Sequence, residues 1–548
     1  MKVPYQQPQP GCYRLARSVH IHGETLICDY PLRVLRPGPT MLRLIASCSE
    51  ERTCAELAAL LKLPLKRVET LCEQLYWKGL LDVGPSVAPE TWPGVSIIIP
   101  TYNRARQLER CLVALLNLHY TPDCIEVIVV DDASSDNTGA LVKRLDCEYA
   151  AKKIALYVVR HTRQKGVATA RNSGAEQARM EVLAFIDSDC VATPDWLKEL
   201  TPIFEDAHIG AVGGMIRACE RRSALGKYED VCSSLFMGVR PQQVKLEGPL
   251  TYLPTANLLV RHSAWQKVDG FAPLTFGEDV DFCRRLLLSG SAIRYEPRGI
   301  VLHDYRTTPL GFVKTRISYA SAEAALLKRH PTERRVLLLP PEQATFAALT
   351  IGGILGLRGR PQGSPPLHST TPALTMIRRT RRQSRSHCKG GGGVEWGGDP
   401  CGRPRPGPGI LSMLFFLFAT MFTLFGTRKR LVALRRQRIS LNPFVVLRAT
   451  LRGHLSYVYH LCRHLTRYYT LPALLVGMIF PPLLLLAFIL CAIVIGVNYA
   501  RLRPRMTTSS FAFCSLLDDC AYEIGVLLGC IKQRTWKPLL PVIKGRTR

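Results

Sequence analysis

Four short apolar runs, separated by amphipathic stretches, dominate the chain between residues 95 and 186. They are rich in β-branched residues, as expected for strands buried on both faces of a sheet, and span Val95–Ile99, Glu126–Val130, Ala155–Val159 and Val182–Ile186. Apolar residues at helical spacing predict helices over Ala105–Leu118 and Ala168–Ala178. Strands that alternate with helices in this way are joined by right-handed crossovers, so we predict an α/β fold with a mostly parallel sheet.

Residues 12–88 have a different pattern and are predicted to form a small separate domain. The pattern predicts a hairpin followed by three helices, over Val19–Ile21, Thr25–Cys28, Pro39–Cys48, Thr53–Leu61 and Leu65–Tyr76. A hairpin with three helices is winged-helix-like and resembles the PqqD-type modules that bind peptide precursors in pathways for ribosomally made, modified peptides. The alternative is an unspecialised helical appendage. Pro85 to Pro93 is predicted to be a linker.

Three uncharged, largely apolar stretches follow residue 340: Gln343–Leu357 with 15 residues, Pro406–Thr427 with 22 and Tyr468–Ala500 with 33. A helix that spans a bilayer needs about 20 apolar residues, so the second and third are long enough. Pro481 and Pro482 interrupt the third, which is therefore either a kinked span or a re-entrant hairpin. Basic residues flank that stretch on both sides and favour the cytoplasmic face for both ends, which a hairpin satisfies and a single crossing does not.

The segment between the first two apolar stretches, residues 359–409, is rich in Gly, Pro, Arg and Ser. It cannot bury enough apolar surface to become ordered, so we predict a disordered insertion. The α/β domain is assigned to residues 95–335, an apolar membrane-associated segment to 336–358 and a membrane-associated helical region to 410–548. Within that last region, the tail around Asp518, Asp519 and Glu523 is expected to be amphipathic and not to span a membrane.

The formal net charge of +29 is concentrated in the C-terminal part of the chain. From Val336 onward there are 29 Lys and Arg residues against 6 Asp and Glu, and residues 1–335 carry the remaining +6. Because the excess accompanies the apolar stretches, we expect a membrane partner and no nucleic acid. The 19 cysteines form no C-x-x-C pair and the chain opens without an apolar signal sequence, so we expect reduced thiols and a cytoplasmic α/β domain.

The strongest candidate for chemistry is an Asp-x-Asp motif, Asp187 and Asp189, at the end of the fourth predicted strand. Ligands in such sheets bind beyond the carboxyl ends of the strands, and two carboxylates one residue apart can hold a hard divalent cation there. We expect Mg²⁺ or Mn²⁺ on this pair, where it would bridge the diphosphate of a nucleotide and neutralise its charge on departure. The alternative is a capping or turn role, which is common for an isolated Asp-x-Asp.

The ends of the first two strands carry residues suited to a nucleotide base. Pro100, Thr101 and Asn103 follow the first strand, and Asp131 and Asp132 end the second. Strand-end aspartates often only cap the next helix. The neighbouring loop favours a base-binding pocket, in which Asp132 accepts a hydrogen bond from a uracil ring nitrogen.

A phosphate contact is predicted near the start of the helix over residues 168–178. Gly166, Arg171 and Asn172 bring a cation and a helix N-terminus to the same rim of the sheet, and both favour a bound phosphate. The alternative is an amphipathic helix with solvated ends.

A second acidic motif, Glu278 and Asp279 after Gly277, begins a predicted helix. Acidic residues there are often only a favourable contact with the helix dipole. A sugar transfer that inverts the anomeric carbon needs one carboxylate to deprotonate the acceptor hydroxyl, so Asp279 is the candidate base and Glu278 the residue that positions the acceptor. His303 could complete the metal site or contact phosphate, but a structural role is equally compatible with the sequence.

Five motifs in this order resemble glycosyltransferase family 2, the inverting enzymes with the GT-A fold that use nucleotide diphosphate sugars: Val95–Arg104, Val129–Asp132, Gly166–Gly174, Phe185–Asp189 and Phe276–Arg285. A narrower resemblance, to the glycosyltransferases of the mycofactocin system, rests on five motifs together with the PqqD-like N-terminal residues. The motifs are Asp187-Ser-Asp-Cys-Val, Tyr252-Leu-Pro-Thr-Ala-Asn-Leu-Leu-Val, Gly277-Glu-Asp-Val-Asp, Arg294-Tyr-Glu-Pro and His303-Asp-Tyr-Arg-Thr-Thr-Pro. This resemblance implies transfer of glucose from a UDP-sugar to a redox cofactor derived from a ribosomal peptide. The insertion at 359–409 departs from that family.

Two other functions remain open from the sequence. One is a membrane-associated glycosyltransferase that acts on a lipid-linked or cell-surface glycan, and the more distant one is a non-catalytic protein that binds peptide or nucleic acid. The Gln-x-x-Arg-Trp motif of processive cellulose- and chitin-type synthases is absent, which argues against extrusion of a long polymer by this chain.

Overall fold

The computed structural model of this chain describes residues 11–16, 19–29, 32–84, 91–248, 250–331, 336–338, 340–356, 408–436 and 441–544. These residues form two compact units. One comprises the chain up to Pro340 together with the part from Leu455 to the C-terminus, and the other runs from Pro341 to His454. The insertion predicted to be disordered, 359–409, lies outside the described residues apart from its last two.

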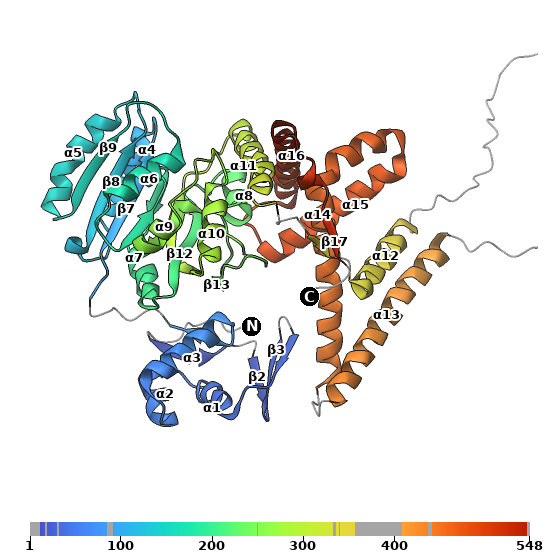
Figure 1. The fold of residues 1–548 in the computed structure, drawn as a ribbon. Helices are drawn as coiled ribbons and strands as arrows, with labels where there is room; N and C mark the ends of the chain where they lie inside the picture. The colour runs from blue at the N-terminus through green and yellow to red at the C-terminus, as the bar shows by residue number, and fades with distance from the viewer. Residues whose placement is uncertain are drawn as a thin grey trace, which may run out of the picture. The chain divides into compact units, whose positions relative to one another are not determined.

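The N-terminal part of the first unit has the predicted hairpin and three helices (Figure 1). Its strands form two small antiparallel sheets, β1 (Cys12–Leu15) with β5 (Arg52–Thr53) and β6 (Leu81–Val83), and β2 (Val19–His22) with β3 (Thr25–Asp29) and β4 (Leu32–Leu35). The helices are α1 (Pro39–Ser47), α2 (Cys54–Leu61) and α3 (Leu65–Trp77). A capping box between Thr53 and Glu56 begins α2. The likeness of these residues to a PqqD-type module stays a prediction.

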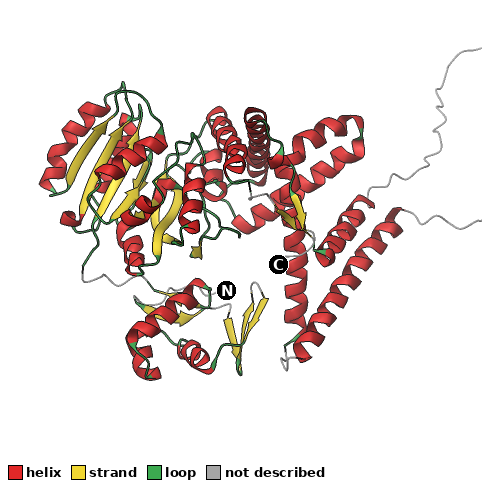
Figure 2. Cartoon of the chain, viewed as in Figure 1, coloured by secondary structure: helices red, strands yellow, loops and turns green. Residues whose placement is uncertain are grey.

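The main sheet has nine strands: eight lie in the order β11-β15-β12-β14-β10-β7-β8-β9, and the ninth, β13 (Gln242–Gln243), pairs with β15. Four of them are the predicted strands, β7 (Val95–Thr101), β8 (Ile125–Asp131), β9 (Ala155–Arg160) and β10 (Val182–Phe185), and they are parallel. Every residue of β7 and β8 is buried, because both faces of the sheet are covered by helices (Figure 2). The α/β class is therefore confirmed.

The second half of the sheet, beyond the four predicted strands, is mixed. It contains β11 (Cys190–Ala192), β12 (Ile209–Ala218), β14 (Leu258–Arg261) and β15 (Ala292–His303). β14 is antiparallel to both β10 and β12, and β11 is antiparallel to β15, whereas β12 and β15 are parallel. Parallel pairing was predicted from the alternation of strands and helices, and this alternation ends at residue 186. It therefore gave no prediction for the pairing of these later strands.

Two cores lie on opposite faces of the sheet. On one face Ile97 and Ile99 pack against α4 (Ala105–Leu115) and α5 (Thr138–Ala151), and on the other Ile98 packs against α6 (Val167–Gln177). The remaining helices of this region are α7 (Trp196–Leu200), α8 (Ala224–Cys232), α9 (His262–Lys267), α10 (Glu278–Leu288) and α11 (Pro309–Arg329), with 3-10 turns η1 (Pro122–Cys124), η2 (Thr201–Glu205) and η3 (Thr255–Asn257).

The last long helix, α16 (Thr508–Gln533), packs along α11. The contact is so close that a Cβ at Gly525 or Gly529 would lie 2.5 and 2.4 Å from backbone oxygens of α11. Asp518 on α16 is buried and accepts a 2.9 Å hydrogen bond from the Arg316 guanidinium of α11, which also donates to Glu229 of α8. Of the acidic residues in the tail predicted to be amphipathic, Asp518 is therefore buried against the α/β domain. After it come η4 (Lys537–Leu539) and β17 (Val542–Lys544), which pairs with β16 (Val336–Leu338).

The 33-residue apolar stretch is divided between two helices, α14 (Pro443–Ile479) and α15 (Pro481–Leu502). Among the described helices α15 is long and apolar enough to cross a membrane by length and composition. The second unit contains α12 (Pro341–Gly356), α13 (Pro408–Arg436) and the first part of α14. In it, Glu342 forms 3.7 Å ion pairs with Lys429 and Arg430.

Candidate active site

The predicted site residues meet at one edge of the sheet, beyond the ends of β7, β8 and β10. The Arg104 guanidinium, just after β7, donates a 2.6 Å hydrogen bond to Asp189 Oδ2, which follows β10. The backbone N–H of Asn103 donates to Ser134 Oγ, beyond β8. The edge forms because β7 pairs in parallel with both β8 and β10, so that the three carboxyl ends coincide.

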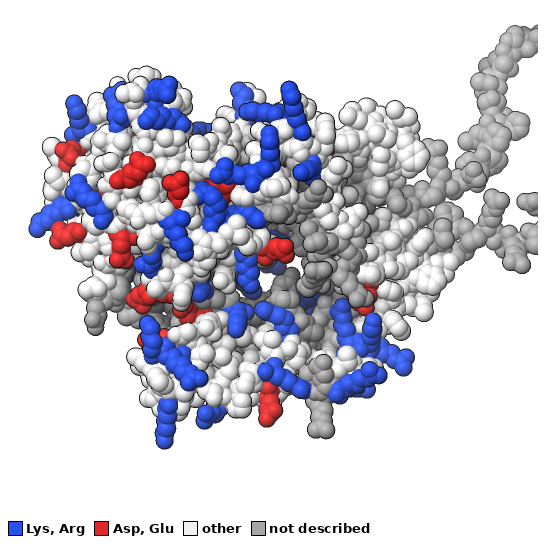
Figure 3. Space-filling model, viewed as in Figure 1, with Lys and Arg blue, Asp and Glu red and all other residues white. Residues whose placement is uncertain are grey.

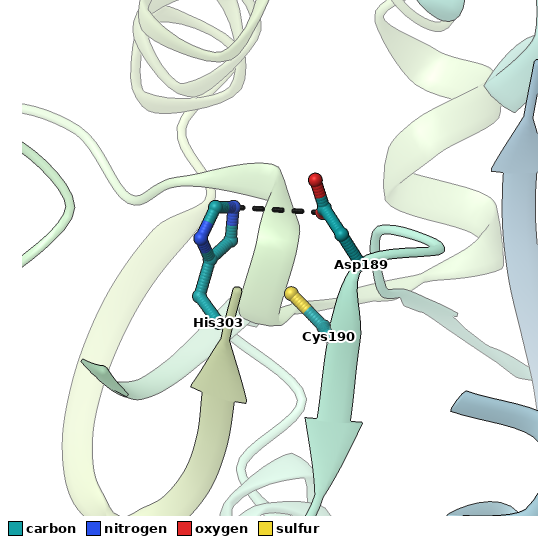
Figure 4. A group of neighbouring side chains, drawn as sticks. All are labelled: Asp189, Cys190 and His303. Carbon is teal, nitrogen blue, oxygen red and sulfur yellow. Dashed lines mark ion pairs between the residues drawn. The ribbon is translucent and has the colours of Figure 1, made fainter. Parts of the chain in front are cut away.

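The Asp-x-Asp motif faces a histidine from a distant strand. His303, at the end of β15, places its Nε2 3.5 Å from Asp189 Oδ1 (Figure 4). Asp189 is buried, and its Oδ1 has no hydrogen-bond partner among the described residues; the same holds for Nδ1 of His303. Polar atoms buried without partners are costly, and a ligand is one way to satisfy them.

These donors fit a hard divalent cation. Asp187, Asp189 and His303 could hold Mg²⁺ or Mn²⁺ through carboxylate oxygens and an imidazole nitrogen, a ligand set both metals accept. Asp189, His303 and the Cys190 thiol form a cluster whose possible ligand atoms all lie within 4.8 Å of one another, and Asp187 is not part of it. Burial, together with the carboxylates of Asp189 and Asp187, raises the pKa of the Cys190 thiol well above its ordinary value. Because a thiol binds metal as the thiolate, Cys190 is a poor candidate ligand.

Arg171 links the two acidic motifs. It lies on α6, is 3% exposed, and donates 2.7 Å hydrogen bonds to Asp187 through Nη2 and to Glu278 through Nη1. Burial raises the pKa of Asp187, but the charge and hydrogen bond of Arg171, together with smaller contributions from His303 and Arg104, outweigh burial, and the pKa is lowered overall. The structure thus gives Arg171 two carboxylate partners, and its predicted contact with phosphate stays a prediction.

We expect Arg171→Met to destabilise the fold by about 3–5 kcal/mol, because it leaves two carboxylates without their buried countercharge. Urea unfolding of the purified protein measures the change. Arg163→Met is the matched control, since Arg163 lies in the same region of the chain but is exposed. Equal unfolding midpoints for the two variants would contradict a buried bridge.

The second acidic motif is positioned by a glycine. Gly277 has φ +81°, and a Cβ there would lie 2.9 Å from the Leu326 side chain of α11, so only glycine fits both the backbone angle and the space. It places Glu278 and Asp279 in the first turn of α10. The Glu278 carboxylate is paired with Arg171, and its predicted contact with an acceptor stays a prediction.

Asp279 is half-buried, and its pKa is raised to about 7. Burial is the main cause and the adjacent Glu278 carboxylate the second, while the N–H of Val280, which donates a 2.8 Å hydrogen bond to Asp279 Oδ1, acts in the opposite direction. A carboxylate with a pKa near neutrality can remove a proton from an alcohol far better than an ordinary aspartate. This property suits the predicted general base.

The raised pKa also predicts a pH-dependent effect on stability. A carboxyl whose pKa is higher in the folded than in the unfolded chain stabilises the fold while it is protonated, and this stabilisation is lost as the pH rises from about 4 through about 7. Asp279→Asn should therefore raise the melting temperature at pH 8 and leave it nearly unchanged at pH 4. Thermal unfolding at the two pH values tests this, with the exposed Asp146→Asn as control. An identical shift at both values would contradict it.

The predicted base pocket is held together by Asp132. Its oxygens accept 2.8 Å hydrogen bonds from the backbone N–H groups of Lys165 and Gly166, and Oδ1 lies 2.7 Å from His161 Nδ1. Burial raises the pKa of Asp132, but these hydrogen bonds outweigh it and lower the pKa overall. Asp132 thus anchors the loop before α6, and its contact with uracil stays a prediction.

The other predicted pocket residues lie beside this loop. Pro100 pairs with Val130 in the sheet, and the buried Thr101 hydroxyl has no hydrogen-bond partner among the described residues. Asn103 has φ +51° and accepts a hydrogen bond from the N–H of Ser135. Thr101 therefore has a free polar atom for a ligand, whereas Asn103 connects two loops.

Two residues near the carboxylates were missed by sequence reasoning. The ring of Tyr319 on α11 packs edge-on against the ring of Phe276, with 6.0 Å between the ring centroids. The pKa of Tyr319 is raised by burial and by the carboxylates of Asp187, Asp189 and Asp279. Arg104, at the end of the first motif, pairs with Asp189. Tyr319 belongs to no motif, so no sequence signal could have found it, whereas Arg104 was already inside the motif Val95–Arg104.

Comparison with known proteins agrees with this arrangement. Residues 96–268 match the family described as Glycosyl transferase family 2. The pre-mycofactocin glycosyltransferase of Mycobacterium tuberculosis is 33% identical over 247 residues, which cover 45% of this chain and 50% of that protein. Glycosyltransferase AglE of Haloferax volcanii is 28% identical over 219 residues, 39% of this chain and 68% of that protein. This chain thus matches about half the length of its mycobacterial relative.

Solved structures give weaker likenesses. The mannosyltransferase PcManGT from Pyrobaculum calidifontis, in complex with GDP-Man and Mn²⁺, has a TM-score of 0.37 and 22% identity, over 46% of this chain and 67% of that one. S. aureus TarS 1–349 in complex with UDP-GlcNAc has a TM-score of 0.33 and 23% identity, over 41% of this chain and 65% of that one. The predicted resemblance to mycofactocin-system glycosyltransferases is confirmed by the sequence comparison, and residues 96–268 match glycosyltransferase family 2.

Proposed function

We propose that this chain is a metal-dependent, inverting glycosyltransferase that transfers a sugar from a UDP-sugar to a peptide-derived redox cofactor. The observation that carries the proposal is the bridge of Arg171 between Asp187 and Glu278, because it fixes the metal-binding motif beside the candidate base Asp279. A donor diphosphate at one end and an acceptor hydroxyl at the other would then be held within one site. The similarity to the pre-mycofactocin glycosyltransferase of Mycobacterium tuberculosis supports this acceptor class.

Each side chain has a distinct part in the proposed reaction. Asp187 and Asp189, with His303, would hold Mg²⁺ or Mn²⁺, which supplies positive charge to the departing nucleotide diphosphate. Asp132 and Thr101 would bind the base of the nucleotide. Asp279 would take the proton of the acceptor hydroxyl. The hydroxyl oxygen would attack the anomeric carbon from the face opposite the diphosphate, which leaves, and the anomeric carbon is inverted.

Nucleotide release by the purified full chain tests the proposal. The protein is incubated with a panel of UDP- and GDP-sugars, with and without Mn²⁺, and with the peptide-derived cofactor as acceptor. The products are identified by mass. We expect release with one UDP-sugar that depends on both metal and acceptor. Hydrolysis without transfer would keep the enzyme class but reject this acceptor, and no metal-dependent nucleotide binding at all would reject the enzymatic proposal.

A second candidate acceptor is a lipid-linked or cell-surface glycan. The apolar helix α15 favours it, because a catalytic domain beside a bilayer could reach an acceptor carried by lipid. Lipid-linked glycan in detergent, offered in the same assay, separates the two candidates by the mass of the glycosylated product. In either case we propose that the catalytic domain lies on the cytoplasmic face, where nucleotide sugars are available.

A further inference from the structure

The end of α14 and most of α15 form an uncharged helical hairpin. Residues 468–500 contain no Asp, Glu, Lys or Arg, and the two helices are separated only by Phe480. Near the base, the Tyr459 hydroxyl donates a 2.7 Å hydrogen bond to Asn498 Oδ1. Near the tip, a Cβ at Gly477 would lie 2.8 Å from the backbone nitrogen of Leu484. Contacts at both ends show that the arms run antiparallel and close together.

The tip of this hairpin exposes large apolar side chains. Ile479 is 88% exposed, Met478 71%, Leu475 62% and Phe480 58%. In Figure 3 the surface over α15 and the end of α14 carries no Lys, Arg, Asp or Glu in that view. A contiguous exposed apolar surface of this kind marks a site of contact with a membrane or another protein.

Polar contacts mark where the first arm leaves the protein. Arg467 on α14 forms ion pairs of 3.3 and 3.0 Å with Asp518 and Asp519 of α16. One turn later the Leu471 backbone N–H donates a 3.0 Å hydrogen bond to Glu523, also on α16. Residues of α14 up to Leu471 are therefore held against α16, and the arm that extends beyond them begins at Pro472.

Apolar contacts hold the second arm near its C-terminal end. Val494 is buried, and Ile495 and Tyr499 pack against a cluster that includes Tyr228 of α8 and Phe312 of α11. The last part of α15 thus belongs to the packed protein. At most residues 481–493 of α15 therefore extend beyond it.

These lengths are too short for a bilayer span. At about 1.5 Å per residue, residues 472–479 extend about 12 Å and residues 481–493 about 20 Å, whereas the hydrocarbon core of a bilayer is about 30 Å thick. We propose that residues 472–493 insert into a single leaflet as a monotopic anchor, with both ends on the face where the catalytic domain lies. Because the second arm of the hairpin returns to the face from which the first arm enters, neither arm crosses the bilayer.

Two features favour lipid over a protein partner. Between the arms lies an apolar crevice of about 160 Å³, lined by residues such as Ala473 and Leu486, which suits acyl chains. At the end of α15, Arg501, Arg503 and Arg505 are exposed, as expected where a monotopic helix meets anionic headgroups. Each such charge near an anionic surface strengthens binding by about fivefold.

A depth measurement on the full chain tests the anchor. An environment-sensitive fluorescent amino acid replaces Phe480, and the protein binds vesicles of phosphatidylcholine and phosphatidylglycerol that carry a quencher at either a shallow or a deep acyl position. We expect the deep quencher to be the more effective, because the tip would lie near the midplane. The same label at Val158, which is exposed on β9, should be quenched by neither.

Two results would overturn the proposal. Quenching of position 480 by a water-soluble quencher trapped inside the vesicles would show that the hairpin crosses the bilayer. Equal fluorescence with and without lipid quenchers would show that the apolar tip contacts no lipid and is a protein interface. Neither readout requires sugar transfer, so this anchor can fail or hold independently of the proposed function.

Discussion

Replacing Asp279 by Asn is expected to lower sugar transfer by about 10²–10⁴-fold, the usual contribution of a general base. Asn has the same shape but cannot accept the acceptor's proton. Nucleotide binding should stay within about twofold of the unchanged protein, because the carboxylates proposed to hold metal, Asp187 and Asp189, are untouched. Transfer is measured as acceptor-dependent nucleotide release, and binding by titration with the nucleoside diphosphate and Mn²⁺.

The pH profile distinguishes a base from a merely structural residue. Since the pKa of Asp279 is about 7, the fraction in the basic form rises as the pH passes from 6 to 8, and activity should rise with it. Asp279→Asn should lose this rise in its residual activity. The exposed Asp146→Asn serves as control and should keep both the rate and the profile. Full activity of Asp279→Asn, or an unchanged profile, would remove Asp279 from the role of base.

Asp189→Ala should abolish the dependence of nucleotide binding on metal. Loss of groups that only support metal ligands already weakens metal binding by about 10–100-fold, so loss of a ligand is expected to cost about 100-fold or more. Titration with Mn²⁺ alone, followed by nucleotide, measures both steps without any sugar transfer.

Two further variants show whether the effect comes from the metal site. Arg104→Ala removes the ion-pair partner of Asp189 while leaving the carboxylate, so it should retain metal binding. Asp123→Ala changes an exposed carboxylate and should have no effect. If Asp189→Ala bound Mn²⁺ and nucleotide as tightly as Asp123→Ala, the metal assignment would be wrong.

The catalytic core illustrates what local pattern can predict. Runs such as Val95–Ile99 are rich in the β-branched residues that favour strands buried on both faces, and in the structure they form parallel strands with polar residues at their carboxyl ends. Because the carboxyl ends of parallel neighbours share one edge, the sequence was enough to bring Asp132 and Asp187 to the same rim. The glycine at position 277, before Glu278, also has a local explanation, because the backbone there has a positive φ that favours glycine.

Side-chain partners could not be predicted in the same way. Arg171 and Glu278 are 107 residues apart in sequence, yet their ion pair is buried, and it depends on how α6 and α10 pack on one face of the sheet. The pKa of Asp279 depends on burial produced by that packing. The sequence therefore indicated which residue types were available, and only tertiary packing assigned each its partner.

The C-terminal region depended on tertiary structure most of all. Charge and hydropathy located the apolar stretch at residues 468–500 and left a kinked span and a hairpin both open. Packing of α16 on α11 buries Asp518 and holds the base of the hairpin, so at most about 12 and 20 Å of its arms extend beyond the protein. Hydropathy measures how apolar a segment is, but the length left free for lipid is set by contacts between distant parts of the chain.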